Sequence, residues 1–178
     1  MLFLLLLILC SFAALILQMF IPSLPWLHGA HVELMPIVMF YGCFALSYPA
    51  AMTLTFCCGL MWDLMTVQVV DSSVEISIGW SIISYSILGS MMHGFRPLYL
   101  EGRWEVHTLL TGVFTSLALL VEYLDITFRR QNPQFPTQVW WLIGGTGLVA
   151  TILSPFFYWL LERLAAWVRY EPEPQPQE

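Results

Sequence analysis

The sequence contains few charged residues that could face solvent. It contains no lysine, so all positive side chains are its six arginines among 178 residues. Only 10% of the residues are charged, whereas an ordinary soluble domain carries about 25%. Nucleic-acid binding requires a basic stripe or patch, and none is present. The composition therefore argues against a soluble domain and against a nucleic-acid partner.

Catalytic and cofactor-binding motifs are also lacking. The sequence has no glycine-rich phosphate loop, no Gly-x-Ser-x-Gly elbow and no His-Glu-x-x-His. His28 and His31 are three residues apart, but in a loop beside prolines, and a metal site needs more ligands with an organised surrounding shell. We therefore expect no enzymatic activity, no metal and no cofactor, although a catalytic set brought together only by the fold would escape this reasoning.

The four cysteines do not resemble a disulfide framework. All of them lie inside apolar runs, whereas the disulfides of small secreted chains join loops. We interpret them as small buried hydrophobic residues. They are Cys10, Cys43, Cys57 and Cys58.

Apolar residues dominate instead, at 58% of the chain. A soluble fold of this length cannot hide that much apolar surface, but a lipid bilayer can accept it. A spanning helix needs about 20 mostly apolar residues, so six helices and short loops would use nearly the whole chain. We predict an all-α, polytopic membrane protein with six transmembrane helices in one bundle, residues 1–170, followed by a tail, residues 171–178.

Prolines and polar stretches set the limits of the six segments. Pro22 and Pro25 end the first, Pro49 separates the second from the third, and Pro155 should kink the last. The tail is rich in proline and glutamate, which predicts an extended, disordered segment. The predicted helices are about Leu2–Ile21, Leu34–Tyr48, Ala50–Val70, Val74–Met92, Val106–Phe128 and Gln138–Trp167.

Arginine placement predicts the orientation. Cytoplasmic loops carry an excess of Lys and Arg. If the N-terminus is cytoplasmic, four arginines face inward and two outward, which favours cytoplasmic termini in a bacterial inner membrane. The inward set is Arg96, Arg103, Arg163 and Arg169, and the outward set is Arg129 and Arg130.

Asp63 is the most informative single residue. It lies within a predicted membrane helix, one turn after Gly59, and a carboxylate at that depth must face the bundle interior or a wet cavity. Three interpretations stay open: a polar anchor for another helix or a partner, a structural carboxyl bonded within the bundle, and a site of ion or proton movement. Candidate internal donors are Ser81, Ser84 and Tyr85.

Other residues indicate contacts between helices or with partners. Small residues four apart allow helices to approach closely, and these are Gly112 with Ser116, Gly147 with Thr151, and Thr111 with Thr115. They pack either within the bundle or against a partner's helix. Glu122 and Asp125 share a helix face with Arg129 and are interpreted as an interfacial charge cluster rather than an acid–base pair. The loop His93–Glu105 offers Arg96, Arg103 and Trp104 for cytoplasmic contacts.

The run from Ala45 to Leu64 resembles the rod shape-determining protein MreD family. That family has a proline or polar break followed by a helix with a Gly-x-x-x-Asp-Leu motif, here Gly59 to Leu64. Length and helix layout are also similar. One departure is that residues 65–68 read Met-Thr-Val-Gln, where the family usually has a glycine-rich stretch.

The resemblance implies a non-enzymatic membrane subunit of the cell-elongation machinery, which supports rod shape and sidewall peptidoglycan synthesis. The implied partners are MreC, the glycan polymerase RodA with its penicillin-binding transpeptidase, and the actin-like MreB, in addition to membrane lipid. The family is also similar in fold to the substrate-binding subunits of vitamin transporters. A small-molecule-binding subunit of a transporter is therefore the alternative function.

Overall fold

The computed structural model of the protein describes residues 1–27, 29–66, 68–70, 73–75, 79–129 and 136–170, with the backbone alone for 68–70, 73–75 and 129. The expectations for His28, Arg130 and the tail 171–178 lie outside the described residues. The described elements, in chain order, are α1 (Leu2–Phe20), the 3-10 helix η1 (Pro25–Leu27), α2 (Met35–Ala45), α3 (Tyr48–Met65), β1 (Gln68–Val70), β2 (Ser73–Glu75), α4 (Trp80–His93), α5 (Arg96–Leu100), α6 (Trp104–Arg129) and α7 (Thr137–Trp167).

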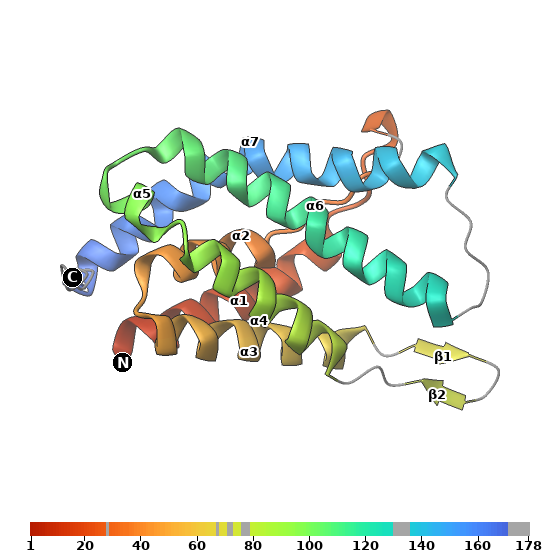
Figure 1. The fold of residues 1–178 in the computed structure, drawn as a ribbon, viewed down its shortest axis with the longest axis horizontal. Helices are drawn as coiled ribbons and strands as arrows, with labels where there is room; N and C mark the ends of the chain where they lie inside the picture. The colour runs from red at the N-terminus through yellow and green to blue at the C-terminus, as the bar shows by residue number, and fades with distance from the viewer. Residues whose placement is uncertain (28, 67, 71–72, 76–78, 130–135, 171–178) are drawn as a thin grey trace.

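The long helices run back and forth between the two ends of one bundle (Figure 1). The Tyr48 hydroxyl at the start of α3 lies 3.3 Å from Ser90 Oγ near the end of α4, so these two helices are antiparallel. The Phe3 ring stacks on the Tyr170 ring with 4.4 Å between centroids. The start of α1 and the residues after α7 therefore share one end of the bundle, the terminal end. The β1–β2 pair projects from the opposite end, the hairpin end.

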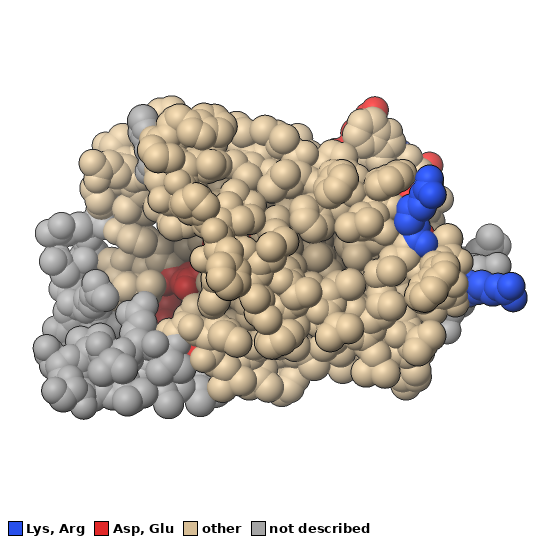
Figure 2. Space-filling view, turned by 180° about the vertical axis from the view of Figure 1, so that it is seen from behind, with Lys and Arg blue, Asp and Glu red and all other residues tan. Residues whose placement is uncertain are grey.

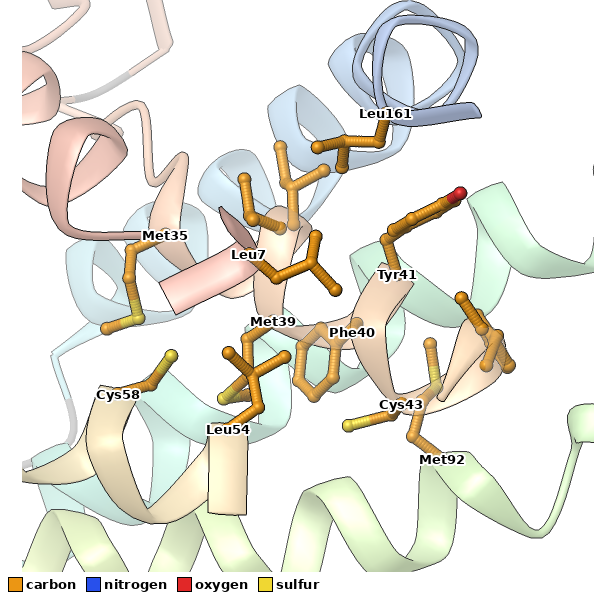
Figure 3. Close-up of a cluster of buried hydrophobic side chains, with 14 of the residues drawn as sticks. Leu7, Met35, Met39, Phe40, Tyr41, Cys43, Leu54, Cys58, Met92 and Leu161 are labelled. Carbon is orange, nitrogen blue, oxygen red and sulfur yellow. The ribbon is translucent and has the colours of Figure 1, made fainter. Parts of the chain in front are cut away.

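Helix α2 lies at the centre of the core. All 11 of its residues are buried, and it packs against α1, α3, α4, α6 and α7. Its length of roughly 16 Å, from a rise of 1.5 Å per residue, is about half the thickness of the hydrocarbon layer. Helix α2 is therefore enclosed by other helices rather than by lipid. The surrounding cluster includes Leu7, Leu54, Cys58, Met92 and Leu161 (Figure 3).

The outer faces of the longer helices are apolar and exposed. Leu9 and Ile152 are each 67% exposed, and Trp167 is 82% exposed. Soluble monomers rarely expose large contiguous apolar surfaces. Figure 2 shows one face whose middle carries no charged side chain, with the charges gathered toward the two ends. Three described helices are long and apolar enough to cross a membrane, namely Leu2–Phe20, Trp104–Phe128 and Thr137–Trp167.

The predicted bounds are confirmed for the first and the last two long helices. Helix α1 ends one residue before the predicted Ile21, and α7 begins one residue before the predicted Gln138 and continues through Pro155. The four cysteines are free; Cys43 and Cys58 are buried as predicted, whereas Cys10 and Cys57 are only partly buried. By length and composition, however, α2, α3 and α4 are not among the candidate spans; α2 and α4 have 11 and 14 residues.

The prediction is wrong at the junction of the third and fourth helices. Helix α3 ends at Met65 instead of Val70, and α4 begins at Trp80 instead of Val74. Between them, β1 pairs with β2 in antiparallel register, with Val69 opposite Val74. This stretch is rich in valine and isoleucine in an alternating pattern, which favours strands over a helix. Its apolar content alone was a misleading sign of helix.

Candidate functional site

Gly59 lies where the backbones of α3 and α4 approach closely. A Cβ at this position would lie 2.5 Å from Ile82 Cα and 2.8 Å from Ile82 N, both of them backbone atoms. No side-chain rotation relieves such a contact, so the absence of a side chain at Gly59 sets how closely the two helices pack. Gly59 thus contacts another helix of the same chain.

Asp63 forms a hydrogen bond with the backbone at the start of α4. Its side chain is 6% exposed, and its Oδ2 accepts a hydrogen bond of 2.6 Å from the Gly79 backbone N–H. Gly79 is the residue before α4 and has a φ of +108°, a conformation that glycine adopts readily. A carboxylate beside a helix N-terminus is also favoured by the helix dipole. The donor is therefore a backbone group and not one of the side chains Ser81, Ser84 or Tyr85.

The small residues of α6 and α7 face one another. A Cβ at Gly112 would lie 2.6 Å from the Gly147 carbonyl oxygen, and a Cβ at Gly147 would lie 2.7 Å from the Gly112 carbonyl oxygen. Ser116 Oγ donates to the Ile143 carbonyl over 3.2 Å, and Thr151 Oγ1 donates to the Gly147 carbonyl over 2.9 Å. The structure therefore brings Gly112, Ser116, Gly147 and Thr151 together in one internal seam.

The expected cytoplasmic loop contacts divide into two kinds. Arg103 is exposed and Trp104 is 62% exposed, so both can contact a partner or headgroups. Arg96 differs from the expectation, because it lies in the first turn of α5 and is only 5% exposed. The short helix α5 turns this arginine toward the bundle.

A cavity of about 450 Å³ opens at the hairpin end, between α1, α3, α6, α7 and the residues before α2. Its walls are mostly apolar and include Leu15, Leu119, Ile126, Val139 and Leu142. The polar groups that line it include Gln18, His31, Glu33, Glu122 and Tyr123, with Trp62 beside them. Figure 2 shows acidic atoms deep in a hollow toward the hairpin end. An apolar cavity with a few polar groups is the usual form of a ligand site.

Two sets of hydrogen bonds hold the residues before α2 in place. Gln18 Oε1, near the end of α1, accepts from the Leu34 and Met35 backbone N–H groups at 2.9 and 3.2 Å. These are donors at the start of α2, which have no partner within their own helix. The His31 backbone N–H donates to Thr146 Oγ1 of α7 over 3.1 Å. Glu33, between these attachments, is thereby fixed at the cavity.

Glu122 of α6 also lines the cavity, and Trp62 Nε1 donates to its Oε1 over 3.3 Å. This contact joins α3 to α6 and places Glu122 at the cavity. The side chain of Arg129 lies outside the described part of the chain. Glu122 also interacts electrostatically with Asp125, three residues further along α6, so the expected grouping of these two acids stays a prediction beside the contact with Trp62.

Glu33 is a largely buried residue whose side chain lines the cavity. It is 8% exposed, and among the residues that the structure describes none donates a hydrogen bond to it. Glu33 belongs to the segment between α1 and α2, outside the candidate spans. Burial, and to a smaller extent the negative charge of Glu122, together raise the pKa of Glu33 to about 8. Two carboxyls thus face one small cavity, and one of them readily holds a proton.

The Glu33→Gln variant should have a flatter pH dependence of stability than the wild-type protein. The pKa of Glu33 rises from 4.5 to about 8 on folding, so the folded state holds a proton that the unfolded chain releases between these values. This stabilisation, on the order of a few kcal/mol, is complete below pH 4.5 and is lost as the pH rises through about 8. Thermal unfolding of both proteins across that range tests it, with exposed Glu105→Gln as the control. Identical profiles for all three proteins would contradict the assignment.

Sequence reasoning did not find Glu33. The residue stands alone before a predicted helix, and its proximity to Glu122 and Trp62 arises only from the packing of α3 and α6. The available signal was an acidic residue directly before the apolar run of α2, without a positive residue nearby in the sequence.

Comparisons with known proteins found no matching family model, no matching curated protein and no matching solved structure.

Proposed function

We propose that the protein is a non-enzymatic, six-pass subunit of the bacterial cell-elongation machinery, supporting rod shape and sidewall peptidoglycan synthesis. It resides in the inner membrane with both termini in the cytoplasm. MreC, RodA with its penicillin-binding transpeptidase, and MreB are the partners that the resemblance implies. The three apolar long helices and the exposed apolar faces support the membrane location.

The single observation that carries the proposal is the role of the Gly-x-x-x-Asp motif. Gly59 sets the spacing of α3 and α4, and Asp63 holds the Gly79 N–H at the start of α4. Both contacts flank the β1–β2 pair, which projects beyond the bundle (Figure 1). A motif that fixes the base of a projecting element gives that element a defined position. A subunit that works by presenting shaped surfaces to partners needs such an arrangement.

Six passes are supported by the alternating directions of the long helices. Helix α1 begins at the terminal end, α7 finishes there, and the β1–β2 pair between α3 and α4 lies at the hairpin end (Figure 1). Helices α2, α3 and α4 would then cross the membrane while packed against the longer helices, which surround the short α2. The terminal end carries Arg103 and Arg163, which suits a cytoplasmic side.

Capture of the tagged full-length protein from gently solubilised membranes tests this function. We expect MreC and the RodA–transpeptidase pair among the co-purifying proteins, and loss of rod shape when the protein is depleted. Depletion without a change in shape, together with capture that yields none of these proteins, would contradict the proposal.

A second candidate function is a substrate-binding subunit of a membrane transporter. The cavity at the hairpin end favours it, because its volume of about 450 Å³ and mixed lining suit a small ligand. In that case the same capture experiment should yield an energising ATPase and a coupling membrane subunit instead of elongation proteins. The two functions are therefore distinguished by the identity of the co-purifying proteins.

A further inference from the structure

The cavity at the hairpin end contains a polar group that its surroundings leave without a partner. Glu33 is 8% exposed, lines the cavity, and receives no hydrogen bond from the described residues. Its carboxyl oxygens are not among the fully buried polar atoms that lack a partner, so they are accessible from the cavity. The Glu33 carboxyl, held between the attachments at Gln18 and His31, is therefore positioned to bind a ligand that enters the cavity.

The charges around the cavity define the sign of its occupant. Glu122 also lines the cavity and interacts electrostatically with Glu33. Asp63 is close enough to Glu122 to interact with it as well. No arginine lines the cavity among the described residues, and lysine is absent from the chain. An anion would find no positive partner among these residues, whereas a cation would pair with the Glu122 carboxylate and favour release of the proton from Glu33.

The remaining walls define the chemistry of the rest of the occupant. They are largely aliphatic, and Trp62 adds an aromatic surface that can attract an organic cation. A small metal ion would leave those walls unused, and the described residues contain no group of three His, Cys, Asp or Glu that could hold one. The occupant therefore carries an apolar body as well as a positive charge.

We propose that this cavity binds an amphipathic organic monocation, with its ammonium group between Glu33 and Glu122 and its apolar body against the aliphatic walls. This inference deepens the second candidate function, on whose cavity it rests. It concerns binding by the purified chain alone. Its failure is therefore distinguishable from a failure of partner capture, which depends on other surfaces.

Three matched probes test the proposal by calorimetry on the purified full-length protein. Phenylbutylammonium, phenylbutanol and phenylbutanoate share one apolar body and carry a positive, neutral or negative head. We expect the ammonium to bind at least about tenfold more tightly than the alcohol, because charge pairing in a buried site is worth more than apolar burial alone. The carboxylate should bind most weakly.

Variants locate the site. Glu33→Gln and Glu122→Gln keep the size of each side chain and should each weaken ammonium binding at least about tenfold. Glu105→Gln, which changes an exposed acid at the terminal end, should leave binding unchanged. Leu142→Trp fills the cavity without altering charge and should abolish binding, which keeps the test decisive if a glutamine variant fails to fold.

Several outcomes would overturn the proposal. They are absence of ammonium binding by the wild-type protein, equal binding of ammonium and alcohol, and wild-type binding by Leu142→Trp. Unchanged binding in Glu33→Gln and Glu122→Gln would likewise overturn it. Selective ammonium binding that is lost in these three variants and kept in Glu105→Gln would establish it.

Discussion

Gly59→Ala is expected to lower the melting temperature of the purified protein by several degrees. The added Cβ would lie 2.5 Å from Ile82 Cα, and a backbone atom cannot rotate away. Helices α3 and α4 must therefore separate or shift along each other, at a cost of about 2 kcal/mol, as in other overpacked sites. The same movement strains the hydrogen bond from Gly79 to Asp63. Gly59→Leu should prevent accumulation of folded protein.

Gly144→Ala is the matched control for this prediction. Gly144 also lies within a helix, α7, but a Cβ there meets nothing within 4 Å. Alanine is a better helix former than glycine, so this variant should be as stable as the wild-type protein or slightly more stable. Thermal unfolding in the same detergent compares the two variants. Equal melting temperatures for Gly59→Ala and Gly144→Ala would show that the α3–α4 contact is not close-packed.

The sequence was most informative where spacing along one helix decides the outcome. Gly112 and Ser116 lie four apart on α6, as do Gly147 and Thr151 on α7, and the structure joins both pairs in one seam. Small residues at that spacing create a smooth strip whichever helix lies opposite. Sequence alone left open whether this strip faces the bundle or a partner, because that depends on the rotation of each helix.

The ends of α3 and α4 could not be placed from apolar content. Residues 66–79 include enough valine and isoleucine to extend either helix, yet Gln68–Val70 and Ser73–Glu75 form β1 and β2. This error also concealed the donor to Asp63. With α4 predicted to begin at Val74, Gly79 would lie inside a helix, where its N–H would already be bonded. The need of Asp63 for a donor was predictable from its depth, but the identity of that donor was not.

The cavity could not be predicted from the sequence, for a different reason. Glu33, Trp62 and Glu122 come from three separate segments, and no local periodicity links them. Their meeting depends on the attachment of the segment before α2 to Gln18. The sequence instead predicted a charge cluster of Glu122 with its neighbour Asp125 on the same helix. A sequence-based interpretation favours such local pairs because it has no information on long-range packing.

The interpretations of Asp63 as a polar anchor and as a site of proton or ion movement predict different results. Asp63→Asn keeps an oxygen that can accept from the Gly79 N–H but removes the charge. Asp63→Leu removes the acceptor and leaves that N–H without its partner, at a cost of about 1–3 kcal/mol. If Asp63 serves to fix the base of the β1–β2 pair, asparagine should retain most function and leucine should not. If Asp63 moves protons or ions, asparagine should fail as badly as leucine.

The most direct test is therefore quantitative co-purification of MreC with the wild-type, Asp63→Asn and Asp63→Leu proteins, at matched membrane levels and with cell shape recorded. Met65→Leu, two residues after Asp63 and at a 45% exposed position, is the control and should behave like the wild-type protein. We predict near-normal association and rod shape for Asp63→Asn, and loss of both for Asp63→Leu although it reaches the membrane. Normal association and normal shape with Asp63→Leu would contradict the account.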